Sequence, residues 1–246
     1  MSNVILVIIM VLAEVLGLSS GADLNRRIEE ALKAELGTKV KEVKVETHIN
    51  KGSLLTKGKI AAIDFTLNSL WVKPLRIEEA YFNVKDVRID AGKVLFGKGE
   101  QSLRSIGEVT FRFTLLPQDL GRALEQENER IREAEVALES GQVVISGRYK
   151  LGPIAPPFQV VGHLTYEGGS QIYYRIQRVR VAGLGLPASF RKKLEDELNP
   201  VFDLNEFHEK RREDFARNEE LVGRPLKLKV RHILVQDDAI VITGEI

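Results

Sequence analysis

The amino-acid sequence predicts an α+β protein in which a strongly curved antiparallel sheet of about ten strands wraps around a long N-terminal helix, with two or three further helices. Three observations support this fold class. Apolar and polar residues alternate over most of the chain, which is typical of strands with one buried face. One early segment instead has the spacing of an amphipathic helix. The alternation also changes phase within several segments, which indicates β-bulges that bend a sheet.

The composition limits the class of protein. The chain has 246 residues, 43% hydrophobic and 29% charged, which is enough to bury a core and excludes a disordered chain. Its 36 Lys and Arg against 35 Asp and Glu give a net charge of +1, so we expect no nucleic-acid partner. Without cysteine there is no disulfide or thiol nucleophile, and four scattered histidines do not suggest a metal site. We expect no cofactor.

Residues 1–22 are interpreted as an export signal or an N-terminal anchor. Residues 4–13 are apolar without a charge, and small residues at 20–22 suit signal peptidase cleavage. The run continues past Glu14 to Leu18 and is still short for a bilayer span, so a cleaved signal is the preferred interpretation. Because no Lys or Arg precedes the run, an uncleaved membrane anchor and a buried first strand stay open.

The helices follow from apolar spacing and from their end signals. Residues 23–36 have a large apolar residue at every fourth position and are followed by Gly37, which predicts a helix with a glycine at its C-terminal end. Further helices are predicted from Pro117 to about residue 132 and over 187–198. The charged segment 203–222 is either a solvated surface helix or an ordered excursion.

The remaining segments are predicted strands. They lie near 40–49, 63–67, 77–90, 109–115, 133–150, 157–181 and 226–246. Turn residues at 90–92, 140–141, 167–170 and 237–238 predict hairpins. No linker divides the chain, so residues 23–246 are expected to form a single domain.

The predicted sheet has more apolar surface than the predicted helices cover. Ten strands at about 4.8 Å spacing make a sheet roughly 48 Å wide and about 30 Å long, and three helices about 20 Å long cover less than half of it. The surplus either closes as a barrel, forms a dimer interface or curls into an apolar trough that acyl chains would fill. An ordinary filled core is an equally good interpretation. Candidate lipid-binding residues lining such a trough are Ile63, Phe65, Leu67, Val109, Phe111 and Phe113, and Leu120 and Leu124 are further lipid-binding candidates.

Charge placement adds a second observation. Residues 168–194 contain six bases and no acid. Each base near an anionic leaflet contributes on the order of 1 kcal/mol to membrane attraction, although a solvated sheet face would have the same pattern. Trp71 beside Lys73 suits a membrane interface or a core. The candidate head-group contacts are Arg178, Arg180, Arg191, Lys192 and Lys193.

Two short motifs match catalytic patterns in the wrong context. Residues 17–21 match a nucleophile elbow centred on Ser19, but no parallel sheet precedes them. Residues 183–188 match a dinucleotide fingerprint, but the chain connects hairpins rather than alternating strands and helices, so a tight turn is expected there. We therefore expect no enzymatic activity.

Five segments can be compared with known families: the opening helix, residues 76–84 (RIEEAYFNV), 111–120 (FRFTLLPQDL), 194–204 (LEDELNPVFDL) and 241–244 (VITG). Together they resemble the LmeA-type bacterial phospholipid-binding family. The resemblance implies an exported envelope protein that binds phospholipids, with a curved sheet about a long helix and no established catalytic residues. The chain departs from the family pattern in its leader and in a charged insertion at about 205–223.

These observations predict an exported, membrane-associated protein of the periplasm or cell envelope. It would hold a phospholipid or similar amphiphile in an apolar groove, for lipid transport or envelope glycolipid maturation. The alternative is a non-enzymatic envelope scaffold that uses its apolar surface for a dimer or a partner. An envelope hydrolase using Ser19 is the third hypothesis.

Overall fold

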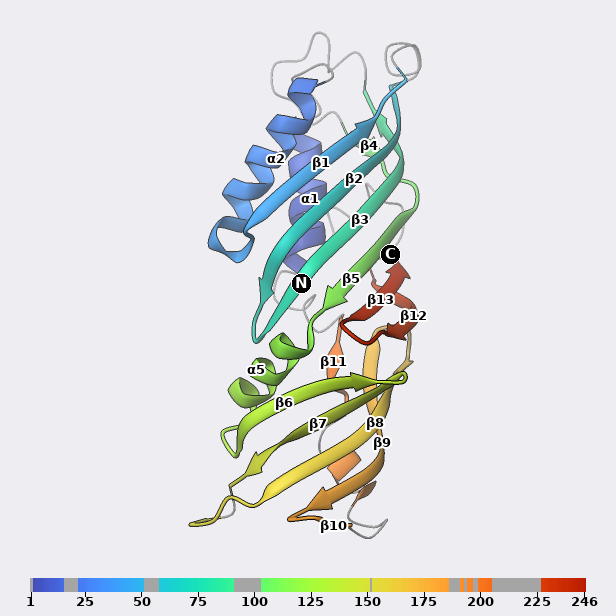
Figure 1. Cartoon of the computed structure of the whole chain (residues 1–246). Helices are drawn as coiled ribbons and strands as arrows, with labels where there is room; N and C mark the ends of the chain where they lie inside the picture. Colours follow the sequence, from blue (N-terminus) through green and yellow to red (C-terminus); the bar gives the residue numbers. More distant parts are fainter. Residues whose placement is uncertain are drawn as a thin grey trace.

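The computed structural model describes residues 2–15, 22–50, 58–90, 103–150, 152–185, 191–192, 194–196, 199–204 and 227–246. In this part of the chain, two open antiparallel sheets follow each other along the long axis of an elongated molecule (Figure 1). Within the same ranges, none of the helices combines the length and apolar character needed to cross a bilayer.

The first sheet has seven strands. They are β1 (Glu42–His48), β2 (Lys59–Val72), β3 (Leu75–Ile89), β4 (Leu103–Ser105), β5 (Val109–Leu115), β12 (Lys229–Val235) and β13 (Ile240–Glu245). Their order is β1-β2-β3-β5-β13-β12, and the short β4 pairs with β3. The C-terminal hairpin therefore returns to a sheet that the N-terminal third of the chain begins.

The second sheet has six strands. They are β6 (Ile131–Glu139), β7 (Gln142–Tyr149), β8 (Pro157–Glu167), β9 (Gln171–Val181), β10 (Leu184–Gly185) and β11 (Phe202–Asp203). Their order is β10-β9-β8-β7-β6, and β11 also pairs with β9. Register shifts in β6/β7 and β8/β9 confirm that bulges interrupt the strands.

The prediction of one sheet of about ten strands around a long helix is wrong. After β5 the chain enters α5 (Pro117–Glu127), and β6 then starts a new sheet. Proline has its φ preset for a first helical turn, so Pro117 takes the chain out of the first sheet at this point. Two helices of similar length, α1 (Ser2–Val15) and α2 (Ala22–Leu36), replace the single long helix.

The predicted helix over 23–36 is confirmed as α2. Gly37 follows it with φ +55°, in the left-handed region that glycine adopts without strain, and the 3-10 turn η1 (Gly37–Lys39) leads into β1. The helix predicted over 117–132 is shorter, because it ends at Glu127 and Ile131 already begins β6.

The other predicted helices are only partly described. Residues 191–192 and 194–196 are helical, as predicted for 187–198, and the rest of that segment lies outside the described residues. At the start of the 203–222 segment, Phe202–Asp203 form β11 rather than a helix, while residues 205–226 lie outside the described residues.

Three predicted hairpins are confirmed, at 140–141, 167–170 and 237–238, whereas residues 91–92 of the fourth lie outside the described ranges. Ser140 and Gly141 both have positive φ, as a two-residue turn that matches strand twist requires. Ala182 and Gly183 form the turn between β9 and β10, so the glycine pattern at 183–188 opens a hairpin. The elbow-like residues 17–21 lie outside the described residues.

Candidate functional site

The apolar face of the first sheet contains six of the candidate residues. Strand pairing places Phe65, Phe82 and Phe111 side by side in one row across β2, β3 and β5. The adjoining rows are Leu67, Ala80 and Phe113, and Ile63, Val84 and Val109. Residues directly opposite each other in an antiparallel sheet point to the same side, so the candidate residues form one continuous apolar surface. Each of the six is at most 3% exposed.

Close packing fixes the aromatic part of this face. The Phe111 and Phe113 rings stack with centroids 4.7 Å apart, and the Phe82 ring meets Phe113 edge-on at 5.6 Å. Phe111 lies over Gly244 of β13, where an added Cβ would stand 2.5 Å from the Phe111 Cζ atom. Glycine is therefore required at this point of β13 for the phenylalanine row to pack.

Helix α2 covers one edge of the same sheet. The Val45 amide of the edge strand β1 donates to a Glu29 carboxylate oxygen at 2.8 Å, and the Thr47 hydroxyl donates to Asn25 at 2.7 Å. These contacts satisfy polar groups that an edge strand otherwise leaves open. The apolar stripe of α2, made of Leu24, Ile28, Leu32 and Leu36, is 0–4% exposed.

We use "the trough" for the space over the three apolar rows, between α2 and β4. Helix α1 lies in this space: it contacts α2 on one side and β4 on the other, and it lies behind β1–β3 in Figure 1. Its side chains Val4, Val7, Ile8, Ile9, Val11 and Leu12 are at most 9% exposed. They belong to the same core cluster as the apolar rows. The trough is therefore filled by the segment that the sequence suggested as a leader.

A small apolar crevice continues the trough at the junction of the two sheets. We call it the waist crevice; it is lined by Val72, Lys73, Pro74, Leu75, Ile77, Phe113, Leu115, Ile172, Phe202, Leu204 and Ile242. Phe113 belongs to both the trough and the crevice. The free space is about 30 Å³, which is room for a water molecule or two. An acyl chain needs the adjoining trough.

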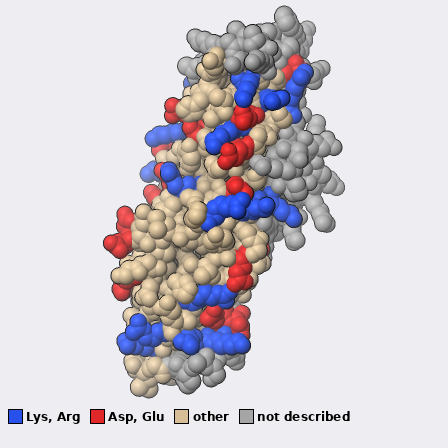
Figure 2. Space-filling view, turned by 90° about the vertical axis from the view of Figure 1, so that its right-hand side faces the viewer, with Lys and Arg blue, Asp and Glu red and all other residues tan. Residues whose placement is uncertain are grey.

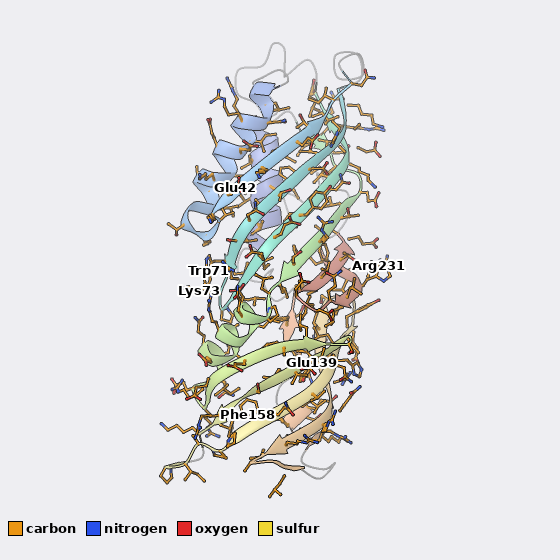
Figure 3. All side chains as sticks on the ribbon, viewed as in Figure 1. Glu42, Trp71, Lys73, Glu139, Phe158 and Arg231 are labelled. Atoms are coloured by element: carbon orange, nitrogen blue, oxygen red, sulfur yellow. The ribbon has the colours of Figure 1, made fainter. Side chains whose placement is uncertain are left out.

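The sequence did not identify most of the crevice, because its walls come from both sheets. In the part of the chain that the structure describes, Lys73 is the only charged residue that lines the crevice. Figure 3 places Lys73 and Trp71 at the lower end of β2, and both side chains are exposed. Trp71 is therefore not a core residue, and its placement at a membrane interface stays a prediction.

The other candidate residues lie away from the trough. Leu120 and Leu124 are half-buried on α5, which packs against β6 and β3. Arg178 and Arg180 are exposed on β9, and Arg191 donates to the Gln177 carbonyl at 2.6 Å. Lys192 is also exposed, and Lys193 lies outside the described residues.

The structure thus separates the expected head-group contacts from the expected tail site. Strand β9 belongs to the second sheet, and its paired end with β10 is the far end of the molecule in Figure 1. Figure 2 shows a row of Lys and Arg side chains crossing this end. The basic residues of β9 therefore lie at the far end of the molecule from the trough.

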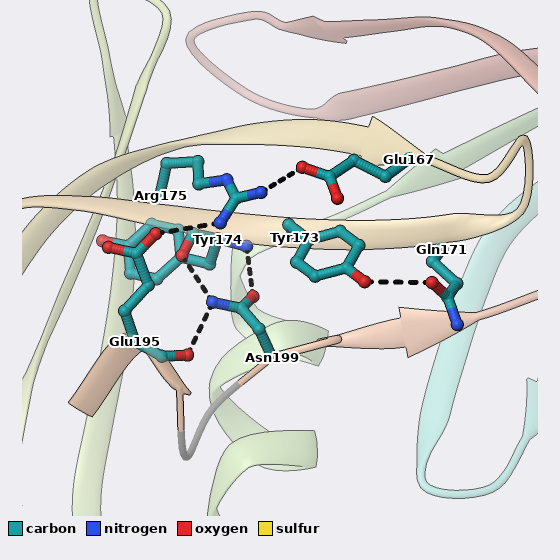
Figure 4. A network of polar contacts seen from close by, with 7 residues as sticks. All are labelled: Glu167, Gln171, Tyr173, Tyr174, Arg175, Glu195 and Asn199. Carbon is teal, nitrogen blue, oxygen red and sulfur yellow. Dashed lines mark hydrogen bonds and ion pairs between the residues drawn. The ribbon is translucent and has the colours of Figure 1, made fainter. Parts of the chain in front are cut away.

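The 194–204 segment has a structural role at the edge of β9 (Figure 4). The Asn199 side chain accepts from the Tyr174 amide at 2.7 Å and donates to the Tyr174 carbonyl at 3.0 Å. It thus makes the two backbone hydrogen bonds that a paired strand would make. Arg175 bridges Glu167 and Glu195, and the hydrogen bond to Glu195 is the main reason that the pKa of Arg175 is raised. Asp203 accepts from Ser170 at 2.8 Å.

This anchorage builds one wall of the waist crevice. Pairing of β11 with β9 fixes Phe202 opposite Ile172, and all three of Ile172, Phe202 and Leu204 line the crevice. Burial raises the pKa of the Tyr174 hydroxyl, which donates to the Val143 carbonyl of β7 at 2.8 Å. Because Asn199 holds the Tyr174 backbone, the segment links β9 and β7 to the crevice wall.

Comparison with known protein families agrees with this geometry. Residues 21–245 match the family model described as LmeA-like phospholipid-binding. The chain belongs to this family. Its membership supports lipid binding in general. The LmeA-like match includes the trough floor, α2 and the crevice, but it begins at residue 21 and so excludes α1. No curated protein and no solved structure matches the chain at the significance required.

Proposed function

We propose that this LmeA-like protein is an exported, non-enzymatic protein of the periplasm or cell envelope that holds a phospholipid or similar amphiphile by its acyl chains. The proposed tail site is the trough with the waist crevice. The observation that carries the proposal is the continuous apolar face of the first sheet, which shares a core cluster with α1, a helix outside the family-matched residues. Such a protein would serve lipid transport or the maturation of envelope glycolipids.

The chemistry of the walls favours hydrocarbon over a polar ligand. The residues that form the three rows are all apolar, and Lys73 is the one charge among the described residues that line the adjoining crevice. Transfer of a methylene group from water to such a surface is favourable by about 0.8 kcal/mol, so a fatty tail gains affinity with each carbon. A polar ligand would lose its hydration without gaining hydrogen bonds.

Lipid content is the direct test. The protein is expressed as the full chain, recovered from the envelope fraction, purified without detergent and extracted with organic solvent for mass spectrometry. We expect phospholipid in the extract, or its measurable uptake from phosphatidylglycerol and phosphatidylethanolamine vesicles. Absence of both contradicts the proposal. A concentration-dependent oligomer without lipid in light scattering would support the scaffold alternative instead.

A further inference from the structure

Helix α1 differs from the rest of the apolar core in its relation to the family. The LmeA-like match begins at residue 21, whereas α1 ends at Val15. The floor and walls of the trough are therefore within the family-matched chain, and the segment that fills it is not. The fold of the first sheet also does not use α1 as a connector, because the chain enters that sheet from α2 through η1 and β1.

The contacts of α1 with the trough are of the kind that a hydrocarbon chain makes. A helix satisfies its backbone hydrogen bonds internally, so only side chains interact with the surroundings, and a lipid tail is as apolar as leucine. Residues 4–13 contain no charged side chain. Ile8, Ile9 and Leu12 are at most 2% exposed in a cluster of aliphatic and phenylalanine side chains.

The dimensions also agree. Helix α1 has 14 residues, so it is about 21 Å long and roughly 10–12 Å across with its side chains. The acyl layer of one leaflet is about 15 Å thick, half of a hydrocarbon core of about 30 Å. Carbons in contact lie about 4 Å apart, so the space that α1 leaves accommodates two tails side by side.

The waist crevice lies at one end of the trough. In Figure 1 the start of α1 is at the level of the lower ends of β2 and β3, and Val72 and Leu75 at those ends line the crevice. Phe113 lines the crevice and belongs to an apolar row of the trough, so the two spaces share a wall. Tails lying along the trough would leave the head group near Lys73.

We infer that α1 and the acyl chains of a phospholipid occupy the trough in turn, so that removal or displacement of α1 opens the lipid site. This inference rests on the proposed function and adds its regulation: the chain covers its own tail site until α1 leaves. The covered state avoids a large exposed apolar surface before a lipid is bound.

A cut between the two helices tests the inference in the folded full chain. A specific protease site is inserted between Ser19 and Ser20, and the protein is cut after folding. Cut and uncut samples are incubated with phosphatidylglycerol and phosphatidylethanolamine vesicles. Bound lipid is measured by mass spectrometry, and the N-terminal fragment is followed by size-exclusion chromatography.

We expect the cut protein to bind lipid and to release the fragment in proportion. The uncut protein should bind at least about tenfold less, because a short tether keeps α1 at an effective concentration in the millimolar range. Equal lipid binding before and after the cut, with the fragment retained, overturns the inference and leaves the proposed function standing. No lipid on either sample overturns both.

A substitution in the uncut chain gives a second measurement. Leu12 is fully buried, so Leu12→Asn weakens the contact of α1 with the trough and should raise lipid uptake several-fold. Leu184→Asn is the matched control, because Leu184 is 72% exposed on β10. Unchanged uptake by a folded Leu12→Asn protein contradicts the inference, with folding checked by circular dichroism.

Discussion

At the scale of single residues, Asp119 joins the two halves of the molecule. Its side chain is 1% exposed in the first turn of α5 and accepts two hydrogen bonds from Arg76 of β3, both at 3.0 Å. The hydrogen bond to Asp119 is the main reason that the pKa of Arg76 is raised. Arg122 adds a longer contact at 3.3 Å. The ion pair therefore fixes α5 beneath the first sheet.

We expect Asp119→Asn to destabilise the protein by about 2–3 kcal/mol, because it removes the more buried of the two carboxylates that pair with the partly buried Arg76 guanidinium. Urea unfolding followed by circular dichroism measures the change. Glu30→Gln is the control: Glu30 pairs with Arg26 on the exposed face of α2, and such pairs contribute about 0.3–0.5 kcal/mol. Equal losses in the two variants would show that Asp119 is not a structural link.

At the scale of elements, α5 approaches β6 closely because of a glycine. An added Cβ at Gly121 would stand 2.6 Å from the Ala134 carbonyl oxygen. A register shift between Arg132 and Glu135 interrupts the β6/β7 pairing at the same place, and the Ala134 amide donates to Glu125 of α5 at 2.7 Å. The helix thus completes the hydrogen bonding of a bulged strand.

We expect Gly121→Ala to destabilise the protein by about 1–3 kcal/mol, since the Ala134 carbonyl belongs to the backbone and cannot rotate away as a side chain could. Alanine gains roughly 1 kcal/mol of helix propensity over glycine, so a stabilised variant would mean that α5 does not hold this close contact. Thermal and urea unfolding give the sign. Gly185→Ala on β10 is the control, because no atom lies within 4 Å of its added Cβ.

Local sequence patterns predicted the individual helices and strands, but they did not predict which strands pair with each other. The four-residue spacing of Leu24, Ile28 and Leu32 predicted α2, and alternation predicted that Phe65 and Leu67 share a face. The pairing of β5 with β13 could not be predicted, since their residues lie more than a hundred positions apart and alternation contains no information on partners. The division into two sheets depends on that pairing.

The candidate site was predictable to the same degree. Alternation identified one face of the trough, but the waist crevice is lined from both sheets and so required the fold. The role of residues 2–15 was ambiguous for a physical reason. An apolar run of this length has the same composition in a leader and in a buried helix, and periodicity does not separate them.

At the scale of the whole molecule, charge and apolar surface lie at different levels of the long axis. The trough is beside the first sheet, the waist crevice with Lys73 is at the junction, and Arg178 and Arg180 lie on the second sheet. With a net charge of only +1, attraction to a membrane must come from such local groups. The basic end is thus suited to contact an anionic surface, and it lies apart from the proposed lipid site at the waist.

This arrangement predicts that docking and lipid content are separable. Arg178→Gln with Arg180→Gln removes two exposed bases, each contributing on the order of 1 kcal/mol near an anionic leaflet, so affinity for phosphatidylglycerol vesicles should fall roughly 30-fold at low ionic strength. High salt should abolish the difference, because screening acts on exposed charges. The lipid bound at equilibrium should be unchanged, since neither arginine lines the waist crevice.

Lys33→Gln with Arg88→Gln is the control, with the same charge change on α2 and β3. Equal loss of vesicle affinity in both double variants would assign docking to net charge rather than to the basic end, and loss of bound lipid in the Arg178 and Arg180 variant would place the head group on the second sheet.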